Sequence, residues 1–115
     1  MTHDILFLLP PGFQDNERRE YCPECAEIWG LLSWFPAIKE SLIINYMPIA
    51  KPRAAMSALL GDKNQNCPTL LLHKESPQYD ECGIMRYRGH HFINNARDIG
   101  KYYAHRFGTP WPRGS

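Results

Sequence analysis

The chain has 115 residues, of which 43% are hydrophobic, and its 13 Lys and Arg against 12 Asp and Glu give a formal net charge of +1. This length supports one domain and leaves too little apolar surface for a second core. A charge so close to balance supplies no long-range field for nucleic acid or anionic lipid, so we expect neither nucleic acid nor a membrane as a partner. We expect a single domain over residues 1–108 and a polar, turn-rich tail over 109–115.

The chain begins with a predicted strand and a predicted helix, separated by a charged loop. The apolar run at 5–9 fits a strand covered on both faces, and the charged loop occupies 13–21. From 23 to 35 apolar side chains recur at helical spacing, so we expect a helix there. Pro23 suits its first turn, where a missing N–H costs nothing, and Pro36 stops or kinks it.

The apolar run near the N-terminus also indicates the cellular compartment. No basic region or cleavage site precedes residues 5–9, and the run is far too short to span a bilayer. We therefore expect a cytoplasmic protein. In a reducing compartment the four cysteines are more typical of catalytic, metal-binding or buried residues than of disulfides.

Two further strands and a short helix are predicted in the middle of the chain. The apolar runs at 42–46 and 69–72 indicate a second and a third buried strand. Between them Pro52 opens a short helix that Gly61 ends at the capping position. The polar stretch at 74–83 is expected to be a long hairpin loop into the last strand.

The C-terminal part predicts a fourth strand and a last helix. The strand lies within 84–93, with His90 and His91 at the surface of the hairpin. Asparagines at 94–95 cap a helix with an aromatic stripe, and Gly108 ends it. The predicted order is β-α-β-α-β-β-α, an α/β fold with a four-stranded mixed sheet. Its first strands are parallel through a right-handed crossover, and its last two form an antiparallel hairpin at one edge.

The sequence Cys22-Pro23-Glu24-Cys25 lies at the start of the first predicted helix. Unpaired backbone N–H groups and the positive end of the helix dipole stabilise a thiolate there, so Cys22 is the expected nucleophile. Cys25, one turn on, lies close enough to resolve a mixed disulfide. Glu24 adds a negative charge that should oppose thiolate formation. This context favours a thiol–disulfide oxidoreductase over half of a zinc site.

Several motifs resemble those of glutaredoxins and of the N-terminal domains of glutathione transferases. They are the first strand, Tyr21-Cys-Pro-Glu-Cys25, Asn66-Cys67-Pro68-Thr69 and the closing Phe92-Ile93-Asn94-Asn95-Ala96-Arg97-Asp98-Ile99-x-x-Tyr102-Tyr103. Over nearly its full length the chain is more closely similar to the bacterial DUF3088 family, a group of small thioredoxin-like proteins without assigned activity. The resemblance implies a thioredoxin-like fold in which substrate binds at Tyr21, Pro23, Cys67 and Pro68.

In thioredoxin-like proteins the proline before the third strand is cis and faces the CxxC turn, so the resemblance implies a cis Cys67–Pro68 bond. The Cys67 backbone would then offer its N–H and C=O to an extended thiol substrate. Its side chain would approach Cys22, which suggests a regulatory disulfide partner, or a Zn or Fe–S cluster held by Cys22, Cys25 and Cys67. The alternative is that Cys67 is a small buried apolar residue. Cys82, in the long loop, is expected to be incidental, an exposed thiol open to oxidation.

Glutathione is a candidate cofactor through the same resemblance, but one departure disfavours it. Where the transferases hold the γ-glutamyl group with an acidic residue and a serine, this chain has Asn95-Ala96. Three arginines, Arg18, Arg19 and Arg53, could meet an anionic substrate, and solvated charge is the alternative reading of them.

Three functions remain open from the sequence. The first is an oxidoreductase that acts on a thiol or disulfide of a protein or a small molecule. The second is a metal-binding module, and the third is a non-catalytic interaction domain that uses its edge strand or an aromatic surface. Trp29, Trp34 and Phe35 are expected in the core or at an exposed rim. A homodimer is a candidate assembly.

Overall fold

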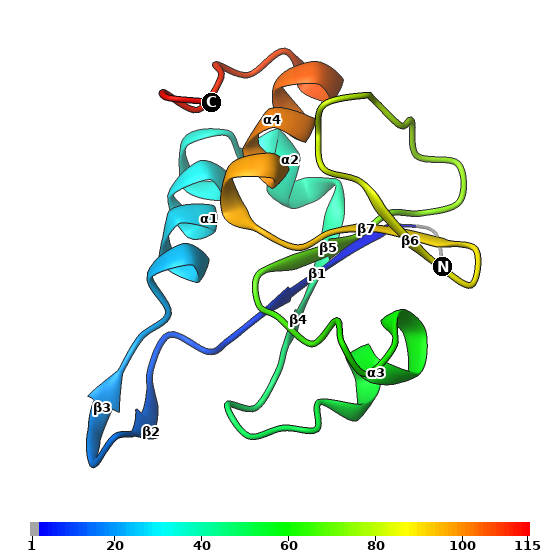
Figure 1. Ribbon diagram of the computed structural model, residues 1–115. Helices are drawn as coiled ribbons and strands as arrows, with labels where there is room; N and C mark the ends of the chain where they lie inside the picture. Colours follow the sequence, from blue (N-terminus) through cyan, green and yellow to red (C-terminus); the bar gives the residue numbers. More distant parts are fainter. Residues whose placement is uncertain (1–2) are drawn as a thin grey trace.

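Strand β1 (Asp4–Leu8) lies inside a sheet that the computed structural model forms from five strands within the described residues, 3–115 (Figure 1). The predicted domain start at residue 1 lies outside that range. The sheet order is β4-β1-β5-β7-β6. β1 pairs in parallel with β4 and antiparallel with β5, and the remaining pairs are antiparallel. The other strands are β4 (Leu42–Tyr46), β5 (Thr69–Leu71), β6 (Met85–Tyr87) and β7 (His90–Ile93).

Helices cover both faces of this sheet. Figure 1 shows α1 (Pro23–Trp34), α2 (Pro36–Glu40) and α4 (Ala96–Phe107) together on one face, and α3 (Ala54–Leu60) on the other. Pro36 was expected to stop the first helix, and it also begins α2, because proline is well suited to a first helical turn. Within residues 3–115, no helix is both long and apolar enough to cross a membrane.

The last helix has the caps that its sequence predicts. The Asn95 side chain accepts a hydrogen bond of 2.9 Å from the Asp98 N–H, which satisfies one of the free donors at the start of α4. At the other end Gly108 adopts a left-handed conformation with φ 70°, where glycine avoids the strain of a Cβ atom.

The core lies between the sheet and the two helix layers. Large side chains with less than 2% exposure come from β1, α1, β5, β7 and α4, among them Leu6, Phe7, Leu8, Ile28, Leu32, Leu70, Phe92, Tyr102 and Tyr103. The first strand is therefore buried on both faces, as its continuous apolar run predicts.

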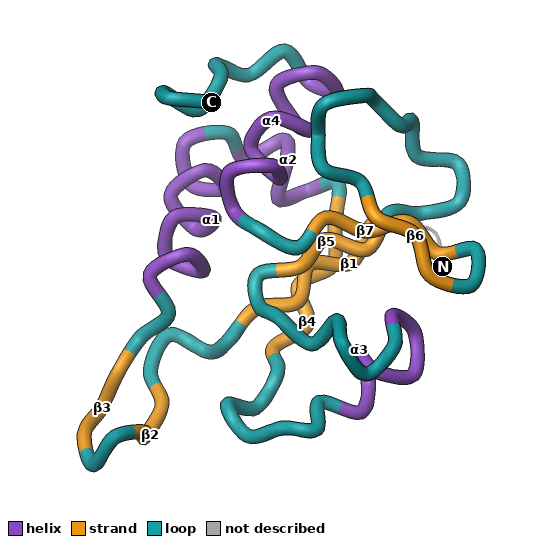
Figure 2. Tube along the Cα trace, in the orientation of Figure 1, coloured by secondary structure: helices purple, strands orange, loops and turns teal. Residues whose placement is uncertain are grey.

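The segment predicted as a charged loop forms a separate hairpin. Strands β2 (Phe13–Asp15) and β3 (Arg18–Glu20) pair with each other and project from the body of the molecule (Figure 2). Asn16 and Glu17 make the turn with φ values of 52° and 60°. The apolar periodicity that marks the other strands is absent from this exposed hairpin, so the prediction of a loop was wrong.

The segment 84–93 contains two strands, β6 and β7, because Arg88 and Gly89 take positive φ values and turn the chain between them. The sheet in residues 3–115 thus has five strands where four were predicted. β7 lies between β5 and β6, so 74–83 is not a hairpin loop. His90 and His91, predicted at the surface, are partly buried in β7.

A buried carboxylate joins the first strand to the last helix. Asp4 is 1% exposed, and its Oδ2 accepts a hydrogen bond of 2.6 Å from Arg106 Nη1. Its Oδ1 accepts bonds from the Ser76 hydroxyl at 2.6 Å and the His73 N–H at 2.7 Å. The long 74–83 loop is thereby fixed against both β1 and α4.

Candidate thiol site

Cys22 is the N-cap of α1. Its extended backbone (φ −84°, ψ 113°) precedes the first turn, and its Sγ accepts a hydrogen bond of 3.1 Å from the Cys25 N–H. Its carbonyl accepts a further bond of 3.0 Å from the Ala26 N–H. The Cys22 side chain is only partly buried. The sulfur thus satisfies one of the free backbone N–H groups at the start of α1.

Cys25 lies in a different environment, although it is only one turn away. It is 4% exposed. Burial raises the pKa of Cys25 to about 12, with a further contribution in the same direction from its hydrogen bond with Cys22, while a backbone hydrogen bond at Leu9 acts in the opposite direction. At neutral pH Cys25 is therefore a protonated thiol shielded from solvent, beside a more accessible partner.

The Cys67–Pro68 peptide bond is cis and lies next to Cys22. The Cys22 thiol donates toward the Cys67 carbonyl oxygen at 3.9 Å, and both Cys67 and Pro68 are buried. The Lys51–Pro52 bond is also cis, which the sequence did not indicate. The structure thus brings together the CxxC turn and the segment that precedes β5.

A hollow of about 310 Å³ opens beside the two CxxC thiols. Tyr21, 65% exposed, and Trp29 flank it, and the complete lining is Leu9, Pro10, Pro11, Tyr21, Cys22, Cys25, Ala26 and Trp29. Of the residues predicted to bind substrate, Tyr21 lines this hollow, whereas Pro23 is exposed on the first turn of α1 and does not. The side chains around the thiols are mainly apolar.

Arg53 was predicted to face solvent or an anionic substrate, and it does neither. It is 5% exposed, because its guanidinium lies beneath the segment before β5. Nε and Nη2 donate to the carbonyl oxygens of Pro48 at 2.8 Å and Ile49 at 3.0 Å, and Nη1 donates to that of Gln65 at 2.6 Å. Nη1 also lies 3.9 Å from Cys67 Sγ. Sequence alone gives no signal for this, since the acceptors are backbone atoms.

The three cysteines predicted as metal ligands form no metal site within the described residues. Within residues 3–115, no group of three or more His, Cys, Asp or Glu side chains is arranged to hold a metal ion, and this applies to Cys22, Cys25 and Cys67 as well. Cys82, expected to be exposed, is fully buried, and burial raises its pKa. The prediction of an exposed, oxidisable thiol was therefore wrong, because burial shields Cys82 from oxidants in solution.

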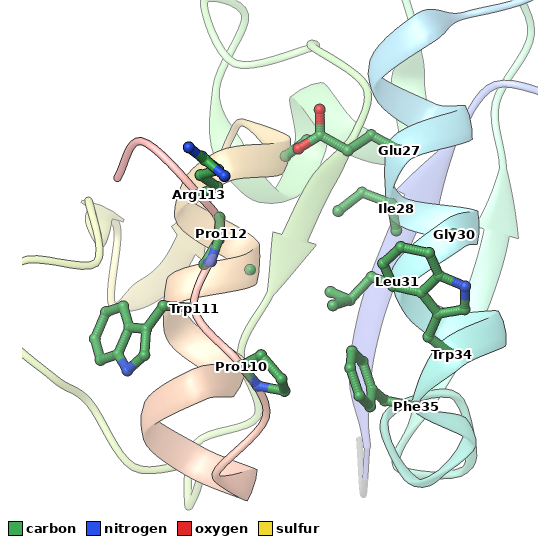
Figure 3. Close-up of a pocket in the computed structure, with 12 residues that line it drawn as sticks. Glu27, Ile28, Gly30, Leu31, Trp34, Phe35, Pro110, Trp111, Pro112 and Arg113 are labelled. Carbon is green, nitrogen blue, oxygen red and sulfur yellow. The ribbon is translucent and has the colours of Figure 1, made fainter.

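A larger groove, of about 680 Å³, lies on another side of α1 (Figure 3). Figure 3 shows α1 along one wall and the C-terminal segment, over α4, along the other. Trp34 is 80% exposed and Trp111 53% exposed at this groove. Its lining is Glu27, Ile28, Gly30, Leu31, Trp34, Phe35, Ala96, Gly100, Pro110, Trp111, Pro112 and Arg113. None of the predicted site residues belongs to it.

Fold and site together define an α/β domain with a CxxC pair at a helix N-terminus, facing a cis X-Pro bond. The chain belongs to the DUF3088 family, described as a protein of unknown function, whose family model matches residues 3–111. Neither the curated proteins nor the solved structures compared with the chain include a match.

Proposed function

We propose that this protein is a cytoplasmic thiol–disulfide oxidoreductase with Cys22 as nucleophile and Cys25 as resolving thiol. The observation that carries the proposal is the contrast between the two thiols. The Cys22 sulfur caps α1 and is partly accessible, whereas Cys25 is buried and its pKa is raised to about 12. One thiol is arranged to attack, and the other is protected until a mixed disulfide forms beside it.

The architecture supports a thioredoxin-like fold for the same proposal. The order β4-β1-β5-β7 combines one parallel pair with antiparallel neighbours, and helices lie on both faces. In this reading β6 is an addition at the sheet edge. The cis Cys67–Pro68 bond beside Cys22 would present backbone groups to an extended substrate.

The proposed reaction oxidises the protein and reduces a disulfide R–S–S–R′. The Cys22 thiolate attacks one sulfur, and R′–S⁻ leaves and takes up a proton. Cys25 then attacks the Cys22 sulfur, and its own proton goes to the departing R–S⁻. The two cysteine thiols become the Cys22–Cys25 disulfide, and R–SH and R′–SH are released. The disulfide of a protein or of a small molecule, glutathione disulfide included, can serve as the substrate.

The experiment is a comparison of single cysteine variants treated with hydroxyethyl disulfide. The wild-type protein should lose two hydrogen masses as an internal disulfide that includes Cys22 forms, and Cys22→Ser should form none. Cys82→Ala is the matched control, since Cys82 is buried away from the site, and it should behave as wild type. A Cys22→Ser variant that reacts like the wild type, or a wild-type protein that forms no disulfide, would contradict the proposal.

A further inference from the structure

Arg53 is a buried cation without a buried anion beside it. Its guanidinium bonds to the neutral carbonyl oxygens of Pro48, Ile49 and Gln65. Among residues 3–115 Arg53 takes part in no ion pair with a carboxylate. A buried charge in neutral surroundings is unfavourable, so any neighbouring group that becomes negative gains from it.

The neighbouring group that can become negative is the Cys67 thiol. Its Sγ lies 3.9 Å from Arg53 Nη1 and 3.9 Å from Met56 Sδ. Burial raises the pKa of Cys67 to about 11, and Arg53 acts against that shift by favouring the thiolate. Cys67 is thus protonated at rest, and its thiolate, once formed, has a cation in place.

The backbone of Cys67 is also in contact with the proposed nucleophile. Cys22 Sγ lies 3.9 Å from the Cys67 carbonyl oxygen. Cys25 has no comparable cation among the described residues: burial and the thiols of Cys22 and Cys67 all raise its pKa. The Cys25 thiol is hydrogen-bonded to Cys22, whereas the Cys67 thiol interacts with Cys22 through charge. Of these two thiols, Cys67 is therefore the one with electrostatic help for a thiolate.

We propose that Cys67 is a second resolving thiol for Cys22, activated by the buried Arg53. This inference rests on the proposed function, because it requires a mixed disulfide on Cys22. It assigns Arg53 as a positioning and activating residue that acts through Cys67.

The step balances without a further reactant. In a mixed disulfide Cys22–S–S–R, the Cys67 sulfur attacks Cys22 Sγ, the bond to the R sulfur breaks, and the Cys67 proton goes to R–S⁻. The products are a Cys22–Cys67 disulfide and R–SH, and the original disulfide substrate is the oxidant. The oxidised protein would thus have two forms, which share Cys22 and differ in its partner.

The test compares Cys25→Ser with Cys25→Ser/Cys67→Ser, each treated with hydroxyethyl disulfide and followed by intact mass and peptide mapping. In the single variant the adduct on Cys22 should give way to a Cys22–Cys67 disulfide, two hydrogen masses below the reduced protein. In the double variant the adduct should persist. Within the Cys25→Ser background, Arg53→Gln should slow this conversion roughly tenfold or more, because a charged contact to sulfur is lost. Arg53→Lys keeps the charge and should retain most of the rate.

Each outcome separates the two proposals. An adduct that is equally persistent in the single and double variants overturns the role of Cys67 and leaves the oxidoreductase proposal standing. The absence of any adduct in both variants shows that Cys22 is unreactive and overturns both. Unchanged conversion in a folded Arg53→Gln protein overturns the role of Arg53. If circular dichroism shows that Arg53→Gln does not fold, Arg53→Lys is tested instead. Conversion of the adduct in Arg53→Lys that is no faster than the reaction of hydroxyethyl disulfide with the buried Cys82 overturns the role of Arg53.

Discussion

Glu24 Oε1 accepts a hydrogen bond of 3.3 Å from the backbone N–H of Ala96, the first residue of α4. The residue between the two thiols is therefore bonded to the start of another helix, 72 residues further along the chain. The positive end of α4 offsets part of the carboxylate charge. The sequence predicts that Glu24 opposes a Cys22 thiolate, and this contact indicates a smaller effect than its place in the CxxC turn suggests.

Replacing Glu24 by glutamine tests that effect. Removal of the negative charge should raise the rate of Cys22 alkylation by iodoacetamide near neutral pH, by no more than a few-fold, and the weaker acceptor should cost about 0.5 kcal/mol of stability. The control is Glu27→Gln on the next turn of α1, whose carboxylate instead lies 3.7 Å from Arg97 Nε. A decrease in the alkylation rate of Glu24→Gln would show that the carboxylate supports the thiolate.

The buried thiols predict a loss of stability in alkaline solution. The pKa of Cys25 is raised to about 12 and that of Cys67 to about 11. Below about pH 8.5 both states of the protein keep these protons, and above it the unfolded chain releases them while the folded protein retains them. The unfolded state then binds fewer protons, so the free energy of unfolding should fall as pH rises toward those values. Urea titrations at a series of pH values measure this. The Cys67→Ala variant should show a shallower decline, and an identical slope would contradict the assignment.

The Asp4–Arg106 ion pair should contribute strongly to stability. Asp4 is 1% exposed, and Asp4→Asn should cost about 3 kcal/mol because Arg106 and the Ser76 hydroxyl lose a charged acceptor. Thermal unfolding by circular dichroism measures the change. Glu20→Gln removes an exposed ion pair with Arg18 on the projecting hairpin and should leave the melting temperature nearly unchanged. Equal effects of the two substitutions would contradict this account.

The two glycines of the Figure 3 groove should respond oppositely to alanine. A Cβ atom on Gly100 would lie 2.7 Å from Pro112 Cγ, so Gly100→Ala should displace the C-terminal segment from α4. A Cβ atom on Gly30 meets nothing within 4 Å, so Gly30→Ala should leave that segment in place and stabilise α1 by up to about 1 kcal/mol. Trp111 fluorescence and limited proteolysis of the C-terminal segment report the difference. A C-terminal segment equally protected in both variants would contradict the packing.

The sequence predicted the elements with strong periodicity and missed those determined by backbone geometry. The strand at 42–46 has the predicted limits, and the α4 caps at Asn95 and Gly108 are confirmed. The β2–β3 hairpin was missed because its turn uses Asn16 and Glu17 at positive φ, without the glycine that usually marks such a turn.

The candidate site was likewise predicted only in part. The position of the CxxC pair at the start of α1 follows from the apolar pattern and Pro23, and the structure confirms that position. The burial of Arg53 could not be predicted, because it depends on backbone carbonyl groups of loops. The path of a loop leaves no periodic pattern in the sequence. The groove of Figure 3 was missed because the segment 109–115 was expected to be a tail, whereas Pro112 packs against Gly100.

The Asp4–Arg106 contact joins residues separated by 102 positions, nearly the whole length of the chain. During synthesis β1 leaves the ribosome before α4, and its buried carboxylate does not have Arg106 as a partner until α4 has also emerged. β5, the antiparallel neighbour of β1, likewise arrives late. The nascent chain therefore cannot complete its core segment by segment. The domain should acquire its structure as one unit once α4 has emerged, slowly for its size because its contacts are long-range.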